Sequence, residues 1–497
     1  MQTRRAFLRN TGFAAASLLL ADRILARPYA PISILEPAVD PVRIRGRVHS
    51  TGGGLSGVRV SDGLSVVRTQ ADGTFELMSN TRQEFVFVSL PRGYNIPTNP
   101  TGTALFYQPL QPDRNGEATA QFNLAKLPTA DDRHAFFLLA DPQMLDEEDV
   151  QRFHAETVVD VFSFSRQLSE QPLFGVACGD IMFDRLQYFP DYERGVKAMA
   201  TPFFQVMGNH DVEVQAKTDE TSAATFRKFF GPTYYSFDRG EIHYVVMDNI
   251  FWFGRYIGYL DQVQLDWLKA DLSFVEEGKT VVVFMHIPLY NQRHIREGKR
   301  TPENAVVVTN RELLYRLLEP YKAYVICGHM HESEYLTDGG AEIHVCGAVC
   351  GAWWSGPICY DGTPNGYSVY EVKGGELTWR YKPTGVDIDR QMRLYPRGAD
   401  PRFPDELVAN VWSADSSWKV IWSEDGIRKG AMDRRIGKDP LSVTLHDGPD
   451  LPKKHRWVDP VPTDHLFYAK PSPGAHDVAV EATDRWGRVY KGTIALE

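Results

Sequence analysis

Residues 203–211 read FFQVMGNHD, and this short stretch decides how the middle of the chain folds. Its first half, residues 203–207, is a mostly apolar run without helical periodicity. Runs of this length are typical of strands that are buried on both faces. Asn209, His210 and Asp211 follow directly after the glycine that ends the run. The stretch therefore predicts a buried strand with polar, metal-binding residue types at its carboxyl end.

The same pattern recurs along the chain. Six further runs are predicted as buried strands: residues 135–140, 173–177, 242–247, 280–285, 323–327 and 343–347. Polar residues follow four of these runs, namely Asp141 and Gln143, then Asp180, then His286, then His329 and His331. Segments 147–169, 261–277 and 309–321 carry apolar residues at helical spacing. Strands alternating with helices predict an α/β core with a largely buried sheet.

β-rich segments flank this core on both sides. From Val42 to Leu127, apolar and polar residues alternate between turns such as Asp72-Gly73, which predicts a small β-sandwich resembling transthyretin-like or carboxypeptidase-regulatory-like modules. After Pro383 the chain is irregular, and short strands are then predicted at 418–422, 476–482 and 488–496. We expect an export signal at 1–30, an N-terminal β-sandwich at 40–128, the α/β domain at 131–383 and a C-terminal β-domain at 384–497.

Composition restricts the possible partners. The 497 residues include 54 basic and 64 acidic side chains, for a net charge of -10. No basic run is long enough to follow a nucleic-acid backbone, so polymeric nucleic acid is not expected as a partner. An anionic substrate would have to be attracted locally, by bound metal or by a few arginines.

The first residues resemble a twin-arginine export signal. Arg4 and Arg5 are followed by Phe7, Leu8 and an apolar segment at 12–21. That segment is shorter than the roughly 20 residues that span a bilayer, so we expect no stable membrane span. The resemblance implies export by the twin-arginine machinery to the periplasm or the exterior.

Five cysteines without a Cys-x-x-Cys pair argue against a disulfide scaffold. Cys178 and Cys327 lie in strand-like runs and are expected to be buried thiols. One disulfide among Cys346, Cys350 and Cys359 stays open as an alternative.

The polar residues that follow the strands should converge. In an open α/β sheet the carboxyl ends of the strands lie along one edge. Carboxylates, an asparagine and three histidines at that edge suit mixed nitrogen and oxygen coordination of a divalent metal.

In chain order, these motifs match the calcineurin-like metallophosphoesterase pattern: Asp141-Pro142-Gln143, Gly179-Asp180, Gly208-Asn209-His210-Asp211, His286 and Gly328-His329-Met330-His331. The chain resembles this family, and its two flanks resemble those of a bacterial exported subgroup. The resemblance implies a β-sandwich core flanked by helices and two divalent metal ions.

The resemblance also implies a role for each residue. One metal would be held by Asp141, Gln143, Asp180 and His331, and the second by Asp180, Asn209, His286 and His329. Asp180 would bridge the two. His210 resembles the general acid that protonates the leaving oxygen, and Asp211 would orient it by hydrogen bonding, with a helix cap as the alternative for Asp211.

Two departures bear on the metal. The commoner first motif of the family ends in histidine, whereas position 143 is glutamine, a weaker and harder donor. This favours manganese, iron or magnesium over zinc, and the identity stays open among manganese, iron and zinc. Residues 179–184 lack the tyrosine of purple acid phosphatases, which argues against a tyrosinate-bound ferric centre.

Four residues are candidates for substrate binding. Trp353, Trp354 and Trp252 could offer a platform for a sugar or a base, with core packing as the alternative. Arg293 could clamp a second phosphate or a carboxylate, with a solvated loop as the alternative.

The predicted activity is hydrolysis of phosphomonoesters or phosphodiesters by a hydroxide that bridges the two metals. Small or envelope-derived molecules are the expected substrates. The alternative is a catalytically inactive module that binds a glycan or a protein. Such a module would be expected to have lost ligands or the acid, and all of them are present in this sequence.

Overall fold

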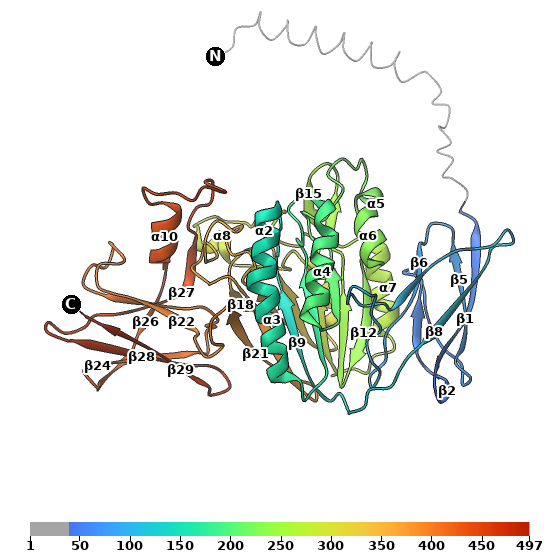
Figure 1. Cartoon of the computed structure of the whole chain (residues 1–497), viewed down its shortest axis with the longest axis horizontal. Helices are drawn as coiled ribbons and strands as arrows, with labels where there is room; N and C mark the ends of the chain where they lie inside the picture. Colours follow the sequence, from blue (N-terminus) through green and yellow to red (C-terminus); the bar gives the residue numbers. More distant parts are fainter. Residues whose placement is uncertain (1–38, 497) are drawn as a thin grey trace, which may run out of the picture.

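The computed structural model describes residues 39–496, so the predicted export signal at 1–30 lies outside the described residues. Figure 1 shows three parts along the long axis, with the N-terminal β-sandwich at one end, a helix-flanked double sheet in the middle and the C-terminal β-domain at the other end. The predicted fold class is confirmed.

Two four-stranded sheets form the N-terminal β-sandwich. The first has the order β2 (Gly53–Gly54), β1 (Pro41–Ser50) and β5 (Thr74–Asn80), with β8 (Glu117–Asn123) parallel to β1. The second has the order β4 (Val66–Arg68), β3 (Arg59–Ser61), β6 (Phe85–Val88) and β7 (Tyr107–Pro109). Alternate residues of β5 point inward, as the period of two predicts.

The middle part consists of two sheets packed face to face. The five-stranded sheet has the order β11 (Phe203–Val206), β10 (Leu173–Cys178), β9 (Arg133–Leu139), β20 (Gly366–Lys373) and β21 (Glu376–Pro383). The six-stranded sheet has the order β12 (Tyr235–Arg239), β13 (Ile242–Val246), β16 (Thr280–Phe284), β17 (Lys322–Cys327), β19 (Ala341–Val345) and β18 (Glu334–Asp338). All seven predicted strands are present. Aromatic rings pack between the two sheets, and the ring centroids of Phe136 and Phe284 are 5.6 Å apart.

Helices cover the outer face of each sheet (Figure 1). On the five-stranded sheet these are α2 (Glu147–Arg152), a π-helical turn (Phe153–Val158), α3 (Val159–Ser165), the short 3-10 turns Arg166–Leu168 and Leu186–Tyr188, α4 (Phe189–Met199), α5 (Asp219–Ser222) and α6 (Ala224–Phe230). On the six-stranded sheet these are α7 (Gln262–Leu272) and α9 (Arg311–Leu318). The predicted helices are therefore present, although the first contains a π-helical turn and the other two are shorter than predicted. The hairpin β14 (Ile250–Trp252) and β15 (Tyr256–Gly258) and the short helix α8 (Arg293–Arg296) complete this part.

The C-terminal β-domain also has two four-stranded sheets. One has the order β22 (Met392–Tyr395), β23 (Leu407–Val411), β27 (Pro462–Ala469) and β26 (Asp433–Lys438). The other has the order β25 (Ile427–Ala431), β24 (Lys419–Glu424), β28 (Asp477–Thr483) and β29 (Val489–Ala495), and α10 (Pro440–His446) lies between β26 and β27 in the chain.

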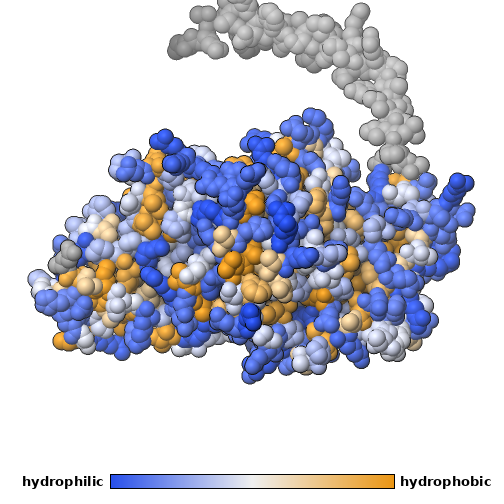
Figure 2. All heavy atoms as spheres, viewed as in Figure 1, coloured by the Kyte–Doolittle hydropathy of each residue, from blue (hydrophilic) through white to orange (hydrophobic). Residues whose placement is uncertain are grey.

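All five cysteines are free and buried, so the structure contains no disulfide between Cys346, Cys350 and Cys359. Within residues 39–496, none of the helices has both the length and the apolar character that a membrane crossing requires. Figure 2 shows hydrophobic residues interspersed among hydrophilic ones on the face that it presents.

Candidate metal centre

The predicted ligands lie where their strands end. Asp141 and Gln143 follow β9, Asp180 follows β10 and Asn209 follows β11, all in the five-stranded sheet. His286 follows β16, and His329 and His331 follow β17, in the six-stranded sheet. The two sheets therefore present their ligand loops to each other across the top of the sandwich.

Asp180 lies at the centre of the cluster. One carboxylate oxygen, Oδ2, is 3.1 Å from His286 Nε2 and accepts a hydrogen bond from Gln143 Nε2 at 2.8 Å. The other oxygen accepts the backbone N–H of His210 at 2.8 Å. His286 Nε2 is 3.1 Å from His329 Nδ1, and ligand atoms of Asp180, His286 and His329 all lie within 4.8 Å of one another.

Backbone carbonyls fix the tautomer of all three predicted histidine ligands. Each donates one ring N–H to a carbonyl oxygen: His286 Nδ1 to Cys178 at 3.0 Å, His329 Nε2 to Ala305 at 2.9 Å and His331 Nδ1 to Gly351 at 2.5 Å. The second ring nitrogens of His286 and His331 then face Asp180 and Asp141, and that of His329 faces His286. Such a second hydrogen bond is typical of metal-bound histidine.

Buried polar atoms without partners also fit a metal. Both side-chain atoms of Asn209, and Nε2 of His331, are buried and make no hydrogen bond. His331 Nε2 is 3.5 Å from Asp141 Oδ1. An unsatisfied buried group costs about 1–3 kcal/mol, a cost that coordination of a cation removes.

The charge of the cluster also fits a cation. Burial alone lowers the pKa of His286, but the facing Asp180 carboxylate outweighs it and raises the pKa to about 9. A proton on His286 Nε2 thus places positive charge between Asp180 and His329, two groups that a divalent metal would join.

The ligand loops are held in strained backbone conformations. Five predicted ligands have positive φ: Asp141 (51°), Gln143 (38°), Asp180 (48°), His329 (70°) and His331 (49°). Such conformations cost roughly 1–3 kcal/mol each and cluster at functional sites. Gly208 permits close approach, because a Cβ atom there would lie 2.0 Å from the backbone nitrogen of Asp180.

His210 lies at the mouth of this centre, with 23% of its side chain exposed. Its Nδ1 is 2.8 Å from Asp184 Oδ1, and its ring centroid is 4.5 Å from that of Phe183. Burial lowers the pKa of His210, but Asp180 and Asp184 together outweigh burial and raise it. Asp184 is thus the carboxylate that orients His210.

The predicted contact between Asp211 and His210 is therefore wrong. The buried Asp211 carboxylate instead accepts backbone N–H groups of Ile181 at 3.1 Å, Met182 at 2.9 Å and Gly208 at 3.0 Å. Asp211 stabilises the two ligand turns and caps no helix. In the sequence, only the position of Asp184 in the loop that follows Asp180 could have indicated this role.

The four substrate-binding candidates have different environments. Trp353 stacks on His331, with ring centroids 4.1 Å apart and planes at 19°. Trp354 is buried, and its Nε1 donates to Pro142 O at 2.9 Å. Both tryptophans have positive φ, 52° and 58°, so they belong to a turn and not to an extended strand. Trp353 is the one of the two whose ring stacks on the ring of a predicted ligand.

Trp252 and Arg293 have structural partners. Trp252 is 8% exposed, and its Nε1 donates to Ala216 O at 3.0 Å, which fits the core-packing alternative. The Arg293 guanidinium lies 4.5 Å from the centroid of Tyr360 and 3.7 Å from Glu332. It is mostly buried, with 17% of its side chain exposed, and does not belong to a solvated loop.

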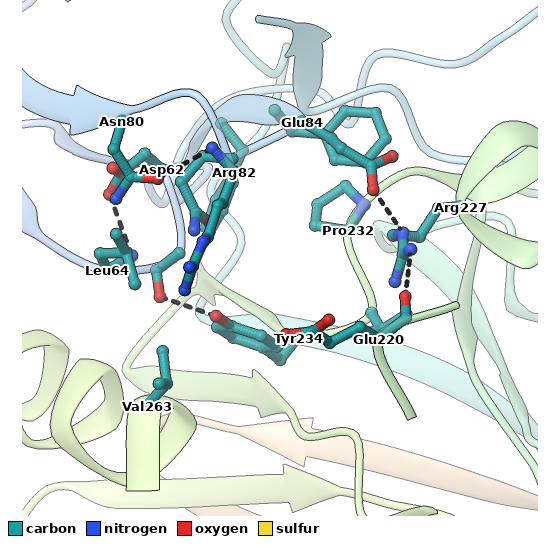
Figure 3. A pocket seen from close by; sticks show the side chains of 15 residues that line it. Asp62, Leu64, Asn80, Arg82, Glu84, Glu220, Arg227, Pro232, Tyr234 and Val263 are labelled. Atoms are coloured by element: carbon teal, nitrogen blue, oxygen red, sulfur yellow. Dashed lines mark hydrogen bonds and ion pairs between the residues drawn. The ribbon is translucent and has the colours of Figure 1, made fainter. Parts of the chain in front are cut away.

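A separate pocket of about 680 Å³ lies between the N-terminal β-sandwich and the middle part. Figure 3 shows Arg82, Tyr234 and Arg227 around it, with Arg227 held by Glu84 and Glu220. None of the predicted ligands lines this pocket, so it is distinct from the metal centre.

Comparison with known proteins identifies the parts of the chain. The family described as "Calcineurin-like phosphoesterase" matches residues 135–333. The families described as "N terminal of Calcineurin-like phosphoesterase" and "C terminal of Calcineurin-like phosphoesterase" match residues 42–127 and 343–490.

Curated relatives match a shorter region. Purple acid phosphatase 15 of Arabidopsis thaliana is 32% identical over 147 residues, which are 27% of this chain and 25% of that protein. Purple acid phosphatase 23 of the same plant is 32% identical over 152 residues, 27% of this chain and 29% of that protein. The chain thus spans about a quarter of the length of these relatives.

Solved structures resemble the chain at low identity. A dimetal phosphatase from Danio rerio is 14% identical with a TM-score of 0.36, covering 50% of this chain and 96% of that one. A purple acid phosphatase from yellow lupin is 12% identical with a TM-score of 0.32, covering 92% and 70%. With matches to the central family and to both of its companion regions, the chain belongs to the calcineurin-like phosphoesterase family.

Proposed function

We propose that this chain is an exported, metal-dependent phosphoric ester hydrolase that acts on small or envelope-derived phosphomonoesters or phosphodiesters. One observation carries the proposal: backbone carbonyls fix the tautomers of three histidines. The second ring nitrogens of His286 and His331 face Asp180 and Asp141, and that of His329 lies 3.1 Å from His286 Nε2. The family match is consistent with this chemistry.

The ligand set proposed for one divalent ion is Asp141, Gln143, Asp180 and His331, and that for the second is Asp180, Asn209, His286 and His329. When bound, the ions activate water as a nucleophile and neutralise charge on the phosphoryl oxygens. Manganese, iron and zinc are the candidate metals. Gln143 now turns its amide nitrogen toward Asp180, so rotation of the amide is required for its oxygen to coordinate.

His210 is the proposed proton donor to the leaving oxygen. Asp184 binds its Nδ1, which directs Nε2 away from that carboxylate. Its partly exposed position at the mouth of the centre allows an ester oxygen to approach. Asp211 acts indirectly, because it holds the turns that carry Asp180 and His210.

Export through the twin-arginine pathway to the periplasm or the exterior rests on the sequence of the first residues. The divisions at 40–128, 131–383 and 384–497 are likewise proposed as domain boundaries. Each falls close to a change of sheet in the structure.

The test combines metal analysis with hydrolysis. The purified protein should contain about two metals per chain. It should hydrolyse nitrophenyl phosphate or bis-nitrophenyl phosphate, lose activity on chelation and regain it with manganese, iron or zinc. Asp180→Asn should lower turnover by about three orders of magnitude or more, because it disturbs both ions.

Asp433→Asn is the matched control, since this side chain is 72% exposed in the C-terminal β-domain. Near wild-type turnover in Asp180→Asn would contradict the site assignment. Bound metal without turnover of either ester would indicate a binding module for a glycan or a protein instead of an enzyme.

A further inference from the structure

The loop of residues 447–461, between α10 and β27, reaches from the C-terminal β-domain to the middle part of the molecule. We call it the bridging loop. Its Lys454 binds Asp149 at 2.6 Å and Asp146 at 2.9 Å, and Asp149 is buried. At its C-terminal end, the backbone N–H of Val461 donates to Tyr360 O at 3.2 Å. The loop is therefore fixed to the middle part at its centre and at its C-terminal end.

The bridging loop places two aromatic rings close to the metal centre. His455 has a φ of 52° and meets Phe183 edge-on, with ring centroids 5.7 Å apart. Phe183 is the residue whose ring lies 4.5 Å from that of His210. A continuous row of rings thus leads from the C-terminal β-domain to the proposed proton donor.

The second ring of the loop reaches a metal ligand. Trp457 lies 4.6 Å from Trp353, which stacks on His331. Trp457 and His455 are themselves 5.5 Å apart at 77°, so the two rows meet at a corner. We call Phe183, His455, Trp457 and Trp353 the aromatic corner.

Trp457 remains open to solvent. It is 57% exposed, whereas its neighbour Val458 is 3% exposed and packs with Tyr360 and Ala352. The backbone here is anchored, so the exposure of Trp457 does not come from a loose segment. An exposed aromatic face on an anchored loop is typical of a binding surface.

The position of His210 indicates what this surface contacts. The leaving group of the ester must lie on the side of its proton donor, and the aromatic corner borders that side. The charge of Lys454 is already matched by Asp146 and Asp149, so the anchor of the loop is not available for a second phosphate. The surface offered to the leaving group is therefore formed by flat rings.

We propose that the aromatic corner binds a flat, uncharged face of the leaving group, either an aromatic ring or the apolar face of a sugar, and so selects the substrate. This inference rests on the proposed phosphoesterase function. Trp457 is the specificity-determining residue, and His455 and Phe183 extend its surface toward His210.

The test uses the metal-loaded full-length protein and three esters whose leaving groups are all alkyl alcohols, so that their chemistry is matched. These are benzyl phosphate, glucose 6-phosphate and glycerol phosphate, or their methyl diesters if the wild-type protein hydrolyses only diesters. Trp457→Ala should raise KM for benzyl or glucose phosphate by about threefold to tenfold, while kcat and all constants for glycerol phosphate stay unchanged. If KM rises for benzyl phosphate, the surface binds an aromatic ring. If KM rises for glucose 6-phosphate, it binds the apolar face of a sugar.

Trp457→Phe should keep KM for the flat substrate close to the wild-type value, because phenylalanine keeps an aromatic ring at this position. Ile427→Ala, at a residue that is 68% exposed on β25, is the matched control and should change none of the constants. An equal change for all three esters, no change for any, or a wild-type preference for glycerol phosphate would overturn the inference. Failure of the metal-loaded wild-type protein to hydrolyse any ester would instead overturn the proposed function.

Discussion

The two β-rich flanks are attached to the middle of the molecule in different ways. At the N-terminal side, Arg59 of β3 contacts a buried cluster of charges. Its Nη2 binds Asp238 at 2.7 Å, its Nε is 3.4 Å from Asp271, and His243 bridges these two carboxylates at 2.8 and 2.9 Å. We call these four residues the N-terminal charge cluster. None of them is a predicted metal ligand.

At the C-terminal side, the contacts reach the ligand loop itself. Asp361 accepts the backbone N–H of Ser333 at 2.8 Å, two residues beyond His331, and His465 of β27 lies 3.1 Å from the same carboxylate oxygen. Arg296 binds the buried Glu332 at 2.9 Å and donates to the backbone of β27. The difference teaches that the N-terminal flank can stabilise the fold without touching the chemistry, whereas the C-terminal flank helps to shape the site.

The largest effect is expected from Arg59→Leu. This change removes the guanidinium from the buried Asp271 and the partly exposed Asp238 and leaves only His243 between them, so the free energy of unfolding should fall by about 3–5 kcal/mol. Activity per folded molecule should stay unchanged, because no ligand loop is touched. Denaturant unfolding and steady-state kinetics on the same samples measure both quantities.

Arg92→Leu is the control for Arg59→Leu, since the pair of Arg92 with Glu241 is exposed and should contribute less than about 1 kcal/mol. If Arg59→Leu protein that is still folded loses activity, the N-terminal flank also affects the metal centre, and the difference between the two flanks is contradicted.

A smaller effect, on metal binding, is expected from Asp361→Asn. The carboxylate positions the turn at Ser333, and residues that hold a ligand from outside typically change metal affinity by about tenfold to a hundredfold. Because Asp361 acts through the backbone, we expect about tenfold weaker metal binding. The metal affinity is measured by following turnover as metal is added. The control is Glu406→Gln, which changes a carboxylate that pairs with Arg435. Unchanged metal affinity would show that the C-terminal contacts serve stability alone.

The smallest effect concerns pH. Burial raises the pKa of Asp238, but Arg59 and His243 together outweigh burial and lower it from 3.8 to about 2. A lowered folded pKa means that this contribution to stability is complete above pH 3.8 and is lost as the pH falls toward 2. Asp238→Asn should therefore reduce the acid-side slope of the melting temperature against pH. If Asp238→Asn has the same slope as the wild type, Asp238 is not a source of the acid-side loss of stability. The exposed Asp389→Asn is the control.

The sequence predicted the strands that are buried on both faces, because continuous apolar runs are a local signal. It did not predict β20, whose place between β9 and β21 depends on pairing with residues far away in the chain. The ligand loops were likewise predictable, since each directly follows a predicted strand.

Side-chain partners were less predictable than the loops. Asp211 is the neighbour of His210 in the sequence, whereas Asp184 belongs to the Asp180 motif 26 residues earlier. Only the three-dimensional path of the turn at Asp180 decides which of the two contacts the ring. Trp457 carried no local signal, because its importance comes from a loop that crosses to another part of the molecule.

The position of β20 also has a consequence for the order of events during synthesis. Strand β9, which leads to Asp141, pairs with β20 at Gly366–Lys373, and these residues leave the ribosome after the last predicted ligand, His331. Until then, one edge of β9 has no strand to pair with, and a bare edge invites association with other chains. A nascent chain that already contains every predicted ligand therefore still lacks the strand that closes its sheet, so a fragment ending near residue 333 should be prone to aggregation.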